Sequence, residues 1–358
     1  MGSLSTFLKP ASRYEAEFVR SSLNRLADST RPHFIGIHPR DLTSEELETI
    51  SFNFNHFVWG YKVDGTRTLI SIVQTCQHEV WYATDRRNET YILSRRHLKD
   101  SPLEKFDVVL CAVLDAELVL NDLIEPAAEP SVPSEATDST PQRSFDLFCF
   151  DLLRWAGRDY AHKPFWIRHR LLGEQFPKHD VVSPRERGED YRIHVCVRNC
   201  ADLRQCSVWT KVAARETSEL AMALQPELVP QCDGIVLYHR NCSYFEKGTI
   251  ACYRWKPPHV LTIDLLIRKH DSEQQRHSLF AWEGKGIYKP VTMKQRVQGV
   301  PEWEGSERIA EFVVNKDMVT FVRWRDDKYC ANHSQQVLRT IRQQQQPLTW
   351  SLLVEATR

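Results

Sequence analysis

Apolar residues recur at two spacings along this chain, and the spacing changes several times. Residues 14–27 place apolar side chains at near-helical intervals, which predicts an early helix. Thr43-Ser44-Glu45-Glu46 has the order of a capping box, so a second helix is expected to begin just after Thr43. Between residues 57 and 85 the apolar positions fall in short runs separated by turn residues, which is typical of strands.

Strand patterns continue through the rest of the chain. Strong β patterns cover 106–120 and 144–153, and helices are predicted around 168–175 and at 335–346. The other predicted strands are 191–197, 206–211, 234–238, 251–256, 261–268, 309–314 and 319–325.

Residues 121–143 differ sharply from their surroundings. They carry four prolines and several acidic side chains, with almost no large apolar groups. Such a segment cannot bury enough apolar surface to offset its ordering entropy. We therefore expect a disordered acidic insertion whose two ends join neighbouring core strands.

Pro257-Pro258 interrupts the strand pattern and suggests a domain boundary. We predict a first domain over residues 1–259, which contains the insertion at 121–143. A second and smaller β domain is predicted over residues 260–358, where it ends in the polar helix.

Composition excludes some classes of protein without identifying one. Of the 358 residues, 42% are hydrophobic and 26% charged, an ordinary globular balance. Lys+Arg and Asp+Glu both number 47, so the formal net charge is zero. This argues against a protein that wraps nucleic acid as histones do, but it allows a local basic patch. No apolar run reaches the roughly 18 residues that span a bilayer, so we expect no membrane partner.

The ten cysteines form no CxxC pair. The closest cluster, His194, Cys196, Cys200 and Cys206, has spacings that fit no common zinc site. We interpret the cysteines as thiols in a reducing compartment, with a metal site as the alternative.

The main chemical signal is Lys62-Val63-Asp64-Gly65-Thr66-Arg67, which ends an apolar run. A free lysine has a pKa of about 10.4, so a nucleophilic lysine needs partial burial or nearby cations. The end of an apolar strand supplies burial, Gly65 allows close backbone approach, and Arg67 offers a forked donor. An ordinary Asp-Gly turn is the alternative.

Two further motifs lie in predicted strands. Glu117 stands inside the apolar run 113–120, where a carboxylate is costly unless it is paired or binds a ligand. Phe150-Asp151 ends a run of alternating aromatics, and a ring can stack on a base for about 1–3 kcal/mol. A solvated strand face for Glu117 and core packing for Phe150 are the alternatives.

Three charged motifs follow in the second half of the chain. Asp233 precedes an apolar strand, and a carboxylate there suits Mg²⁺. Arg254 and Lys256 alternate along one strand, so both can face one phosphate group. A third motif also alternates its cations, with a solvated charge run as the alternative; its charged residues are Arg323, Arg325, Asp327 and Lys328.

In order and spacing, these six elements resemble the motifs of the covalent nucleotidyltransferases: the mRNA capping guanylyltransferases and the ATP-dependent DNA and RNA ligases. The resemblance spans about residues 34–342. It is closer to the capping enzymes, because Trp255-Lys256-Pro257-Pro258 is similar to their KWKP element and residues 323–328 to their RxRxDK element. The family has a lysine at the position of Arg254. Arginine keeps the positive charge but lacks the compact geometry of an ammonium group. Ala116 stands in place of the usual glycine.

The resemblance implies a role for each matched residue. Lys62 would attack the α-phosphate of GTP and pass GMP to the 5′-diphosphate end of an RNA, making the GpppN cap. Asp233 would bind Mg²⁺ or Mn²⁺. Arg67 and Glu117, assisted by Arg86, would hold the ribose. The remaining contacts would be Phe150 and Arg198 to guanine, Arg254 and Lys256 to the α-phosphate, and Arg323, Arg325, Asp327 and Lys328 to the pyrophosphate.

The same resemblance implies the fold and the partners. The expected fold class is α+β, with a mixed, mainly antiparallel nucleotidyltransferase domain followed by a C-terminal OB-fold β-barrel. The sequence has no His-Cys-x5-Arg phosphatase signature and no Gly-rich methyl-donor site. A separate RNA triphosphatase and cap methyltransferase are therefore expected, with the RNA polymerase II machinery as a further partner. The family implies a nuclear location, and a viral or cytoplasmic capping site stays open.

Two other functions also stay open. An ATP-dependent polynucleotide ligase shares the superfamily motifs, although the 254–258 motif and the short second domain disfavour it. A catalytically inactive homologue that binds capped RNA or partner proteins is favoured only by Arg254 and the acidic insertion. Lys62 and Asp233, both intact, weigh against it.

Overall fold

The computed structural model describes residues 4–29, 34–99, 102–104, 107–121, 143–177, 179–182, 191–197, 201–202, 232–246, 252–258, 261–269, 277–291, 296–314, 318–326, 328–349 and 352–353. The predicted insertion at 121–143 lies outside these residues except for its two ends. The predicted strand 206–211 and the predicted site residues Arg198 and Asp327 also lie outside them.

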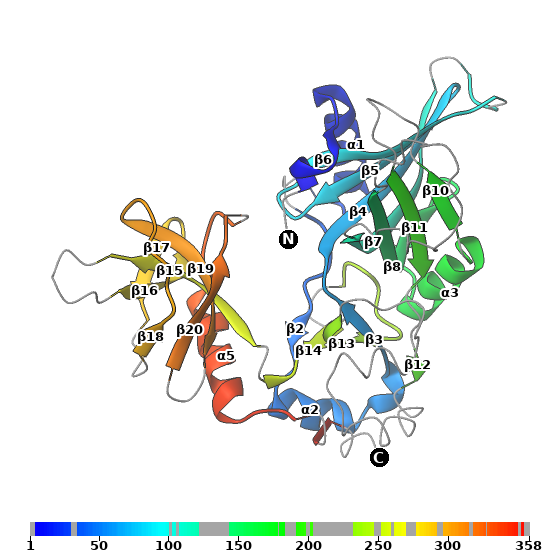
Figure 1. The fold of residues 1–358 in the computed structure, drawn as a ribbon. Coiled ribbons are helices and arrows are strands. Elements are labelled where there is room, and N and C mark those ends of the chain that lie inside the picture. The colour runs from blue at the N-terminus through cyan, green and yellow to red at the C-terminus, as the bar shows by residue number, and fades with distance from the viewer. Residues whose placement is uncertain are drawn as a thin grey trace, which may run out of the picture. The chain divides into compact units, whose positions relative to one another are not determined.

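The described residues form two compact units (Figure 1). One unit contains the chain up to Arg40 and most of the described residues between Asn55 and Arg254. The other contains Asp41–Phe54 and the chain from Trp255 onward. The second unit is therefore built from separate stretches of sequence.

A nine-stranded sheet forms the larger part of the first unit. Its neighbouring strands are antiparallel, except that β11 runs parallel to β8. In spatial order the strands are β1 (Lys9–Pro10), β6 (Thr90–His97), β5 (His78–Asp85), β4 (Thr66–Thr75), β7 (Val108–Asn121), β8 (Arg143–Trp155), β11 (Tyr191–Val197) and β10 (His179–Val182), with β9 (Arg158–Asp159) beside β8.

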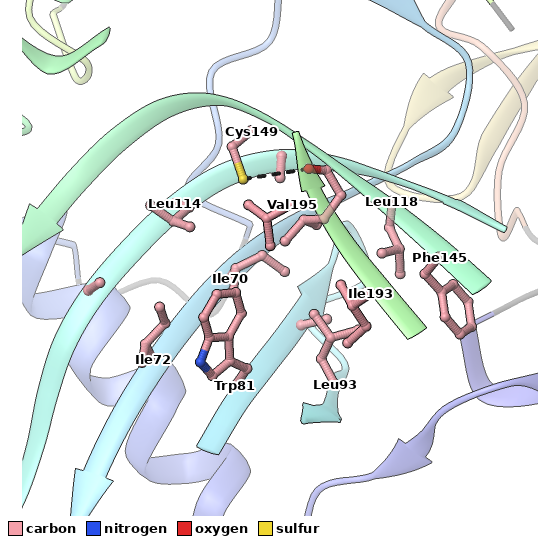
Figure 2. Close-up of a cluster of buried hydrophobic side chains, with 14 of the residues drawn as sticks. Ile70, Ile72, Trp81, Leu93, Leu114, Leu118, Phe145, Cys149, Ile193 and Val195 are labelled. Atoms are coloured by element: carbon pink, nitrogen blue, oxygen red, sulfur yellow. Dashed lines mark hydrogen bonds between the residues drawn. The ribbon is translucent and has the colours of Figure 1, made fainter. Parts of the chain in front are cut away.

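Alternation along β4 and β7 gives this sheet two buried faces. One face carries Ile70, Ile72, Leu114 and their neighbours, which form the cluster drawn in Figure 2. The opposite face carries Leu69 and Val113 in a second cluster, which includes residues of the helix α1 (Arg13–Leu26). Strands buried on both faces account for the long apolar runs in the sequence.

A five-stranded sheet holds the rest of the first unit's strands. Its order is β12 (Ala201–Asp202), β3 (Phe57–Val63), β13 (Cys232–His239), β14 (Cys252–Trp255) and β2 (Arg40–Asp41). The helix α3 (Phe165–Gln175) follows β9, and its Phe165 packs with Val58 and Val236 of this sheet.

The second unit contains a six-stranded sheet and its own core, which includes Leu265, Phe312 and Val337. The strand order is β17 (Ile287–Pro290), β16 (Ser278–Gly284), β15 (Thr262–Arg268), β19 (Glu307–Val314), β20 (Met318–Trp324) and β18 (Arg296–Gln298). No strand pair in the described residues closes this sheet into a barrel. The helices are α2 (Ser44–Ser51) and α5 (Ser334–Gln345), and short 3₁₀ turns elsewhere cover Leu4–Thr6 and Phe54–His56.

The fold is strand-rich with few helices, as the alternating patterns predict. The helices expected at 14–27, 168–175 and 335–346 are confirmed, and Thr43 and Glu46 form the predicted capping box. The strands β16 and β17 were not predicted: the apolar residues of β16, Leu279 to Trp282, are consecutive and do not alternate, and β17 is only four residues long. No helix in the described part of the chain is long and apolar enough to cross a membrane.

Candidate active site

The motif Lys62–Arg67 lies where the chain passes from one sheet to the other. Lys62 is near the end of β3 in the five-stranded sheet, and Arg67 is near the start of β4 in the nine-stranded sheet. Gly65 links the strands against β7: a Cβ added there would lie 2.7 Å from the Leu118 carbonyl oxygen and 2.8 Å from Cγ of Glu117. Close approach, rather than unusual backbone angles, therefore explains this glycine.

Lys62 and Asp233 form an ion pair with Nζ and Oδ1 2.7 Å apart. The register explains how Asp233 reaches the lysine. Val63 pairs with Cys232 and Lys62 pairs with Gly234, so Asp233 is the extra residue of a β-bulge. Both side chains are about one-fifth exposed, which leaves the pair accessible to a ligand.

Arg67 is almost fully buried and is held from two sides. Its Nε donates to Oδ1 of Asp115 at 3.0 Å, and NH2 donates to Oδ2 at 2.5 Å. NH1 donates to the backbone carbonyl of Ile37. Burial by itself lowers the pKa of Arg67, but the charge and hydrogen bonds of Asp115 outweigh burial and raise it well above its ordinary value.

The strand register gathers Glu117 and Arg86 beside Arg67. Glu117 of β7 lies directly opposite Arg67 of β4. Asp85 lies opposite Thr68, so the turn after β5 brings Arg86 to the same edge. Burial and then the charge of Arg67 lower the pKa of Arg86, whereas Glu117 acts in the opposite direction. The structure thus brings together the three residues expected at the ribose.

Phe150 is the extra residue of a second β-bulge. Asp115 pairs with Asp151, and Ala116 pairs with Cys149. The ring is 5% exposed, packs near Tyr238, and lies 5.2 Å from the Arg67 guanidinium carbon. Core packing therefore accounts for much of its surface, and its role on guanine stays a prediction.

Arg254 and Lys256 are half-buried on either side of Trp255, which is buried. Arg254 lies in β14, which ends at Trp255, so Lys256 follows the strand and the predicted strand through both cations extends one residue too far. Arg254 lies within electrostatic range of Arg86 and of His38.

His38 is a site residue that the sequence reasoning did not single out. Burial and then the charges of Arg67 and Arg86 lower its pKa, so the imidazole is neutral near pH 7. Proximity to these arginines comes from folding, and the sequence reasoning assigned this histidine no role.

A sequence model of the family described as "mRNA capping enzyme, catalytic domain" matches residues 9–258, more than half of the chain. This chain belongs to that family. It is therefore a nucleotidyltransferase of the mRNA capping type, and its membership rests on the sequence match. Comparison with curated protein sequences finds no match.

Solved structures similar to this capping enzyme domain include DNA ligases. A mycobacterial DNA ligase D complexed with ATP and MES shares 14% identity, with 76% of this chain and 90% of that chain covered and a TM-score of 0.36. A Lig E DNA ligase shares 14% identity, with 81% and 100% covered and a TM-score of 0.31. The ligase domain of M. tuberculosis LigD shares 14% identity, with 76% and 90% covered and a TM-score of 0.29.

The second unit carries the cations of the 323–328 motif, of which the structure describes Arg323, Arg325 and Lys328. Arg323 Nε lies 2.6 Å from Oε2 of Glu311, and Arg325 NH1 lies 2.8 Å from Oδ1 of Asp264. Lys328 also pairs with Asp264. These cations are thus held by two acids of their own sheet.

Asp233 is the predicted metal ligand. No group of three or more His, Cys, Asp or Glu side chains within the described residues could hold a metal ion. A single carboxylate that shares the ion with nucleotide phosphates and water is the usual arrangement for Mg²⁺. The single carboxylate of Asp233 therefore fits a metal that enters with its nucleotide rather than a permanently bound one.

Proposed function

We propose that this chain is an mRNA guanylyltransferase. Lys62 attacks the α-phosphate of GTP, a nitrogen–phosphorus bond forms, and pyrophosphate leaves. The 5′-diphosphate end of an RNA then takes GMP from the lysine and becomes a GpppN cap. The observation that carries the proposal is the Lys62–Asp233 ion pair at 2.7 Å in a chain of the capping family.

Asp233 controls the state of the nucleophile in this proposal. A carboxylate at 2.7 Å favours the protonated ammonium, which cannot attack. The lysine has to lose its proton before the nitrogen–phosphorus bond forms. A divalent cation, Mg²⁺ or Mn²⁺, would offset the phosphate charge when bound with the nucleotide. Asp233 would then bind the cation and no longer pair with Lys62.

The preference for GTP is inferred from sequence elements. Lys256-Pro257-Pro258 and Arg323-x-Arg325 resemble capping rather than ligase elements. Arg67, Arg86 and Glu117 would contact the ribose, and Arg254 and Lys256 the α-phosphate. We infer that Arg325 and Lys328 exchange Asp264 for pyrophosphate oxygens during the first step.

Incubation with α-labelled GTP or ATP tests the proposal. GTP should label the protein, and the bond should be labile in acid and stable in base, as expected for a phosphoramidate. Lys62→Ala should abolish labelling, whereas the exposed Lys163→Ala should retain it. Labelling by ATP alone would favour a polynucleotide ligase, and no labelling by either nucleotide would favour an inactive RNA-binding homologue.

Several further properties belong to the same proposal. A 5′-diphosphate RNA is the second substrate, and a separate RNA triphosphatase and cap methyltransferase act before and after this chain. The RNA polymerase II machinery is the expected partner, and the nucleus the expected location. We also infer that the second unit is related to the OB-fold, since β16, β15, β19 and β20 are antiparallel neighbours in one sheet and α5 contacts β15 and β16.

A further inference from the structure

Tyr244 has no place in the proposed reaction, yet its hydroxyl lies inside the network that holds Arg67. The hydroxyl donates to Oδ2 of Asp115, the carboxylate that also binds Arg67. It accepts a hydrogen bond from the backbone N–H of Ile37 at 3.3 Å. Tyr244 is 3% exposed and Asp115 fully buried, so water does not compete for these bonds.

Tyr244 and Arg67 bind the two backbone polar groups of the same residue, Ile37. Tyr244 receives the N–H of Ile37, and Arg67 donates to its carbonyl. The next residue is His38, which lies in the electrostatic field of Arg67, Arg86 and Arg254. One hydroxyl therefore fixes both a predicted ribose contact and the segment that presents His38.

Tyr244 is itself held firmly. Its backbone N–H donates to the carbonyl of Ala161 at 2.7 Å. Two residues earlier, the carbonyl of Cys242 accepts from NH1 of Arg168 at 3.1 Å. Arg168 is in turn clamped by Asp151, with both bonds at 2.8 Å. The hydroxyl is thus placed by a rigid loop and not by a mobile side chain.

We propose that Tyr244 is a positioning residue for the nucleotide site, which acts through Asp115 and Ile37 on Arg67 and His38. The inference rests on the proposed function, because it assumes that these residues contact a nucleoside triphosphate. Without the hydroxyl, Asp115 keeps its two hydrogen bonds from Arg67 but loses the third, and the Ile37 N–H loses its partner. Arg67 then samples orientations that do not bind ribose.

Tyr244→Phe tests this role, with Tyr82→Phe as a matched control. Tyr82 is also buried, and its hydroxyl also donates to a carboxylate, Glu15, that an arginine, Arg95, holds. No predicted site residue takes part in that second arrangement. Both variants lose a hydrogen bond from a tyrosine hydroxyl to a carboxylate, and Tyr244→Phe also loses the bond that the hydroxyl accepts from the Ile37 N–H. Each is expected to lower the melting temperature by a few degrees, because one lost hydrogen bond costs roughly 1 kcal/mol.

Only Tyr244→Phe is expected to weaken nucleotide use. The KM for GTP in adduct formation should rise about tenfold while the maximal rate changes less, since an organising contact is lost and the nucleophile is untouched. Equal KM values for Tyr244→Phe and the wild type would overturn the role. An equal rise in Tyr82→Phe would also overturn it, because the effect would then follow stability.

Equilibrium binding separates this inference from the proposed function. GTP affinity is measured for Lys62→Ala and for the double variant Lys62→Ala/Tyr244→Phe. Because neither protein has the lysine that would accept GMP, the difference in affinity reports on the nucleotide contact alone. A tenfold loss of affinity supports the positioning role even if the wild type transfers no GMP. Unchanged affinity overturns the role while guanylyl transfer by the wild type still stands. If neither GTP nor ATP binds, both proposals fail.

Discussion

Single residues at this site owe their placement to irregular strands. Asp233 and Phe150 are each the extra residue of a β-bulge, on β13 and β8. A bulge turns one side chain out of the regular alternation, and bulges are common next to active sites. Neither irregularity is visible in the apolar pattern of the sequence.

Gly65→Ala is predicted to damage both stability and activity. The new Cβ would meet the Leu118 carbonyl oxygen at 2.7 Å, so β7 and Glu117 would have to shift. We expect a loss of about 1–3 kcal/mol in the free energy of unfolding and at least a tenfold slower adduct formation. Urea denaturation and labelling by GTP measure the two effects.

The control for this substitution is Gly173→Ala. Gly173 lies in α3, and a Cβ there would meet nothing within 4 Å. Alanine should therefore stabilise the helix by about 0.5–1 kcal/mol. If Gly65→Ala behaved like Gly173→Ala, the close contact with β7 would have no energetic weight.

Asp233→Asn is predicted to leave the fold intact and remove activity. The amide keeps the size of the side chain but loses the charge that pairs with Lys62 and binds a cation. We expect adduct formation to fall by about 100-fold or more, with an altered dependence on Mg²⁺ concentration. Asp159→Asn, which alters a surface ion pair with Arg154, should retain full labelling.

At the scale of elements, strand register decides which charges meet. Asp264 of β15 lies opposite Glu311 of β19, and Glu311 lies opposite Arg323 of β20. Three charged residues thus form one row across the sheet of the second unit. The acids keep the cations in place, and they compete with any phosphate for those cations.

The second unit is predicted to lose stability in acid. Burial raises the pKa of Glu311, but hydrogen bonds from Thr262 and Arg323 outweigh it, so the pKa lies below its ordinary value of 4.5. The stabilisation is therefore complete above pH 4.5 and is lost as pH falls through the folded value. Glu311→Gln should flatten this loss.

Thermal denaturation between about pH 6 and about pH 3 measures this effect. The exposed Glu302→Gln in the same unit serves as the control and should keep the wild-type pH profile. A Glu311→Gln profile parallel to that of the wild type would show that other groups dominate the acid response.

At the scale of the whole molecule, each unit has a core of its own. Leu114 and Leu265 are both fully buried, one in each unit. Units with separate cores unfold as separate cooperative transitions unless their interface is large and apolar.

Leu114→Ala and Leu265→Ala are predicted to act on different calorimetric transitions. Each cavity should cost about 2–5 kcal/mol in its own unit and leave the other transition nearly unchanged. Differential scanning calorimetry of the full chain measures this. A single transition lowered equally by both substitutions would contradict independent unfolding.

Much of the candidate site was predictable because its chemistry is local in sequence. Lys62–Arg67 carries the proposed nucleophile, a glycine and an arginine within one strand–turn–strand segment, and Arg254 and Lys256 are two residues apart at the end of β14. Other members were not predictable: His38 and Tyr244 reach the site only through long-range contacts with Arg67 and Asp115.

The sequence by itself determined the family and the strand-rich fold class, and it suggested the residues proposed to carry the chemistry, because alternating apolar positions and ordered motifs depend on local spacing. Only the tertiary structure decided that Asp233 pairs with Lys62, that Asp115 holds Arg67, and that Tyr244 bonds the same Asp115. Strand register and β-bulges produce these contacts, and both depend on which strands pair, a choice made by residues far apart in the chain.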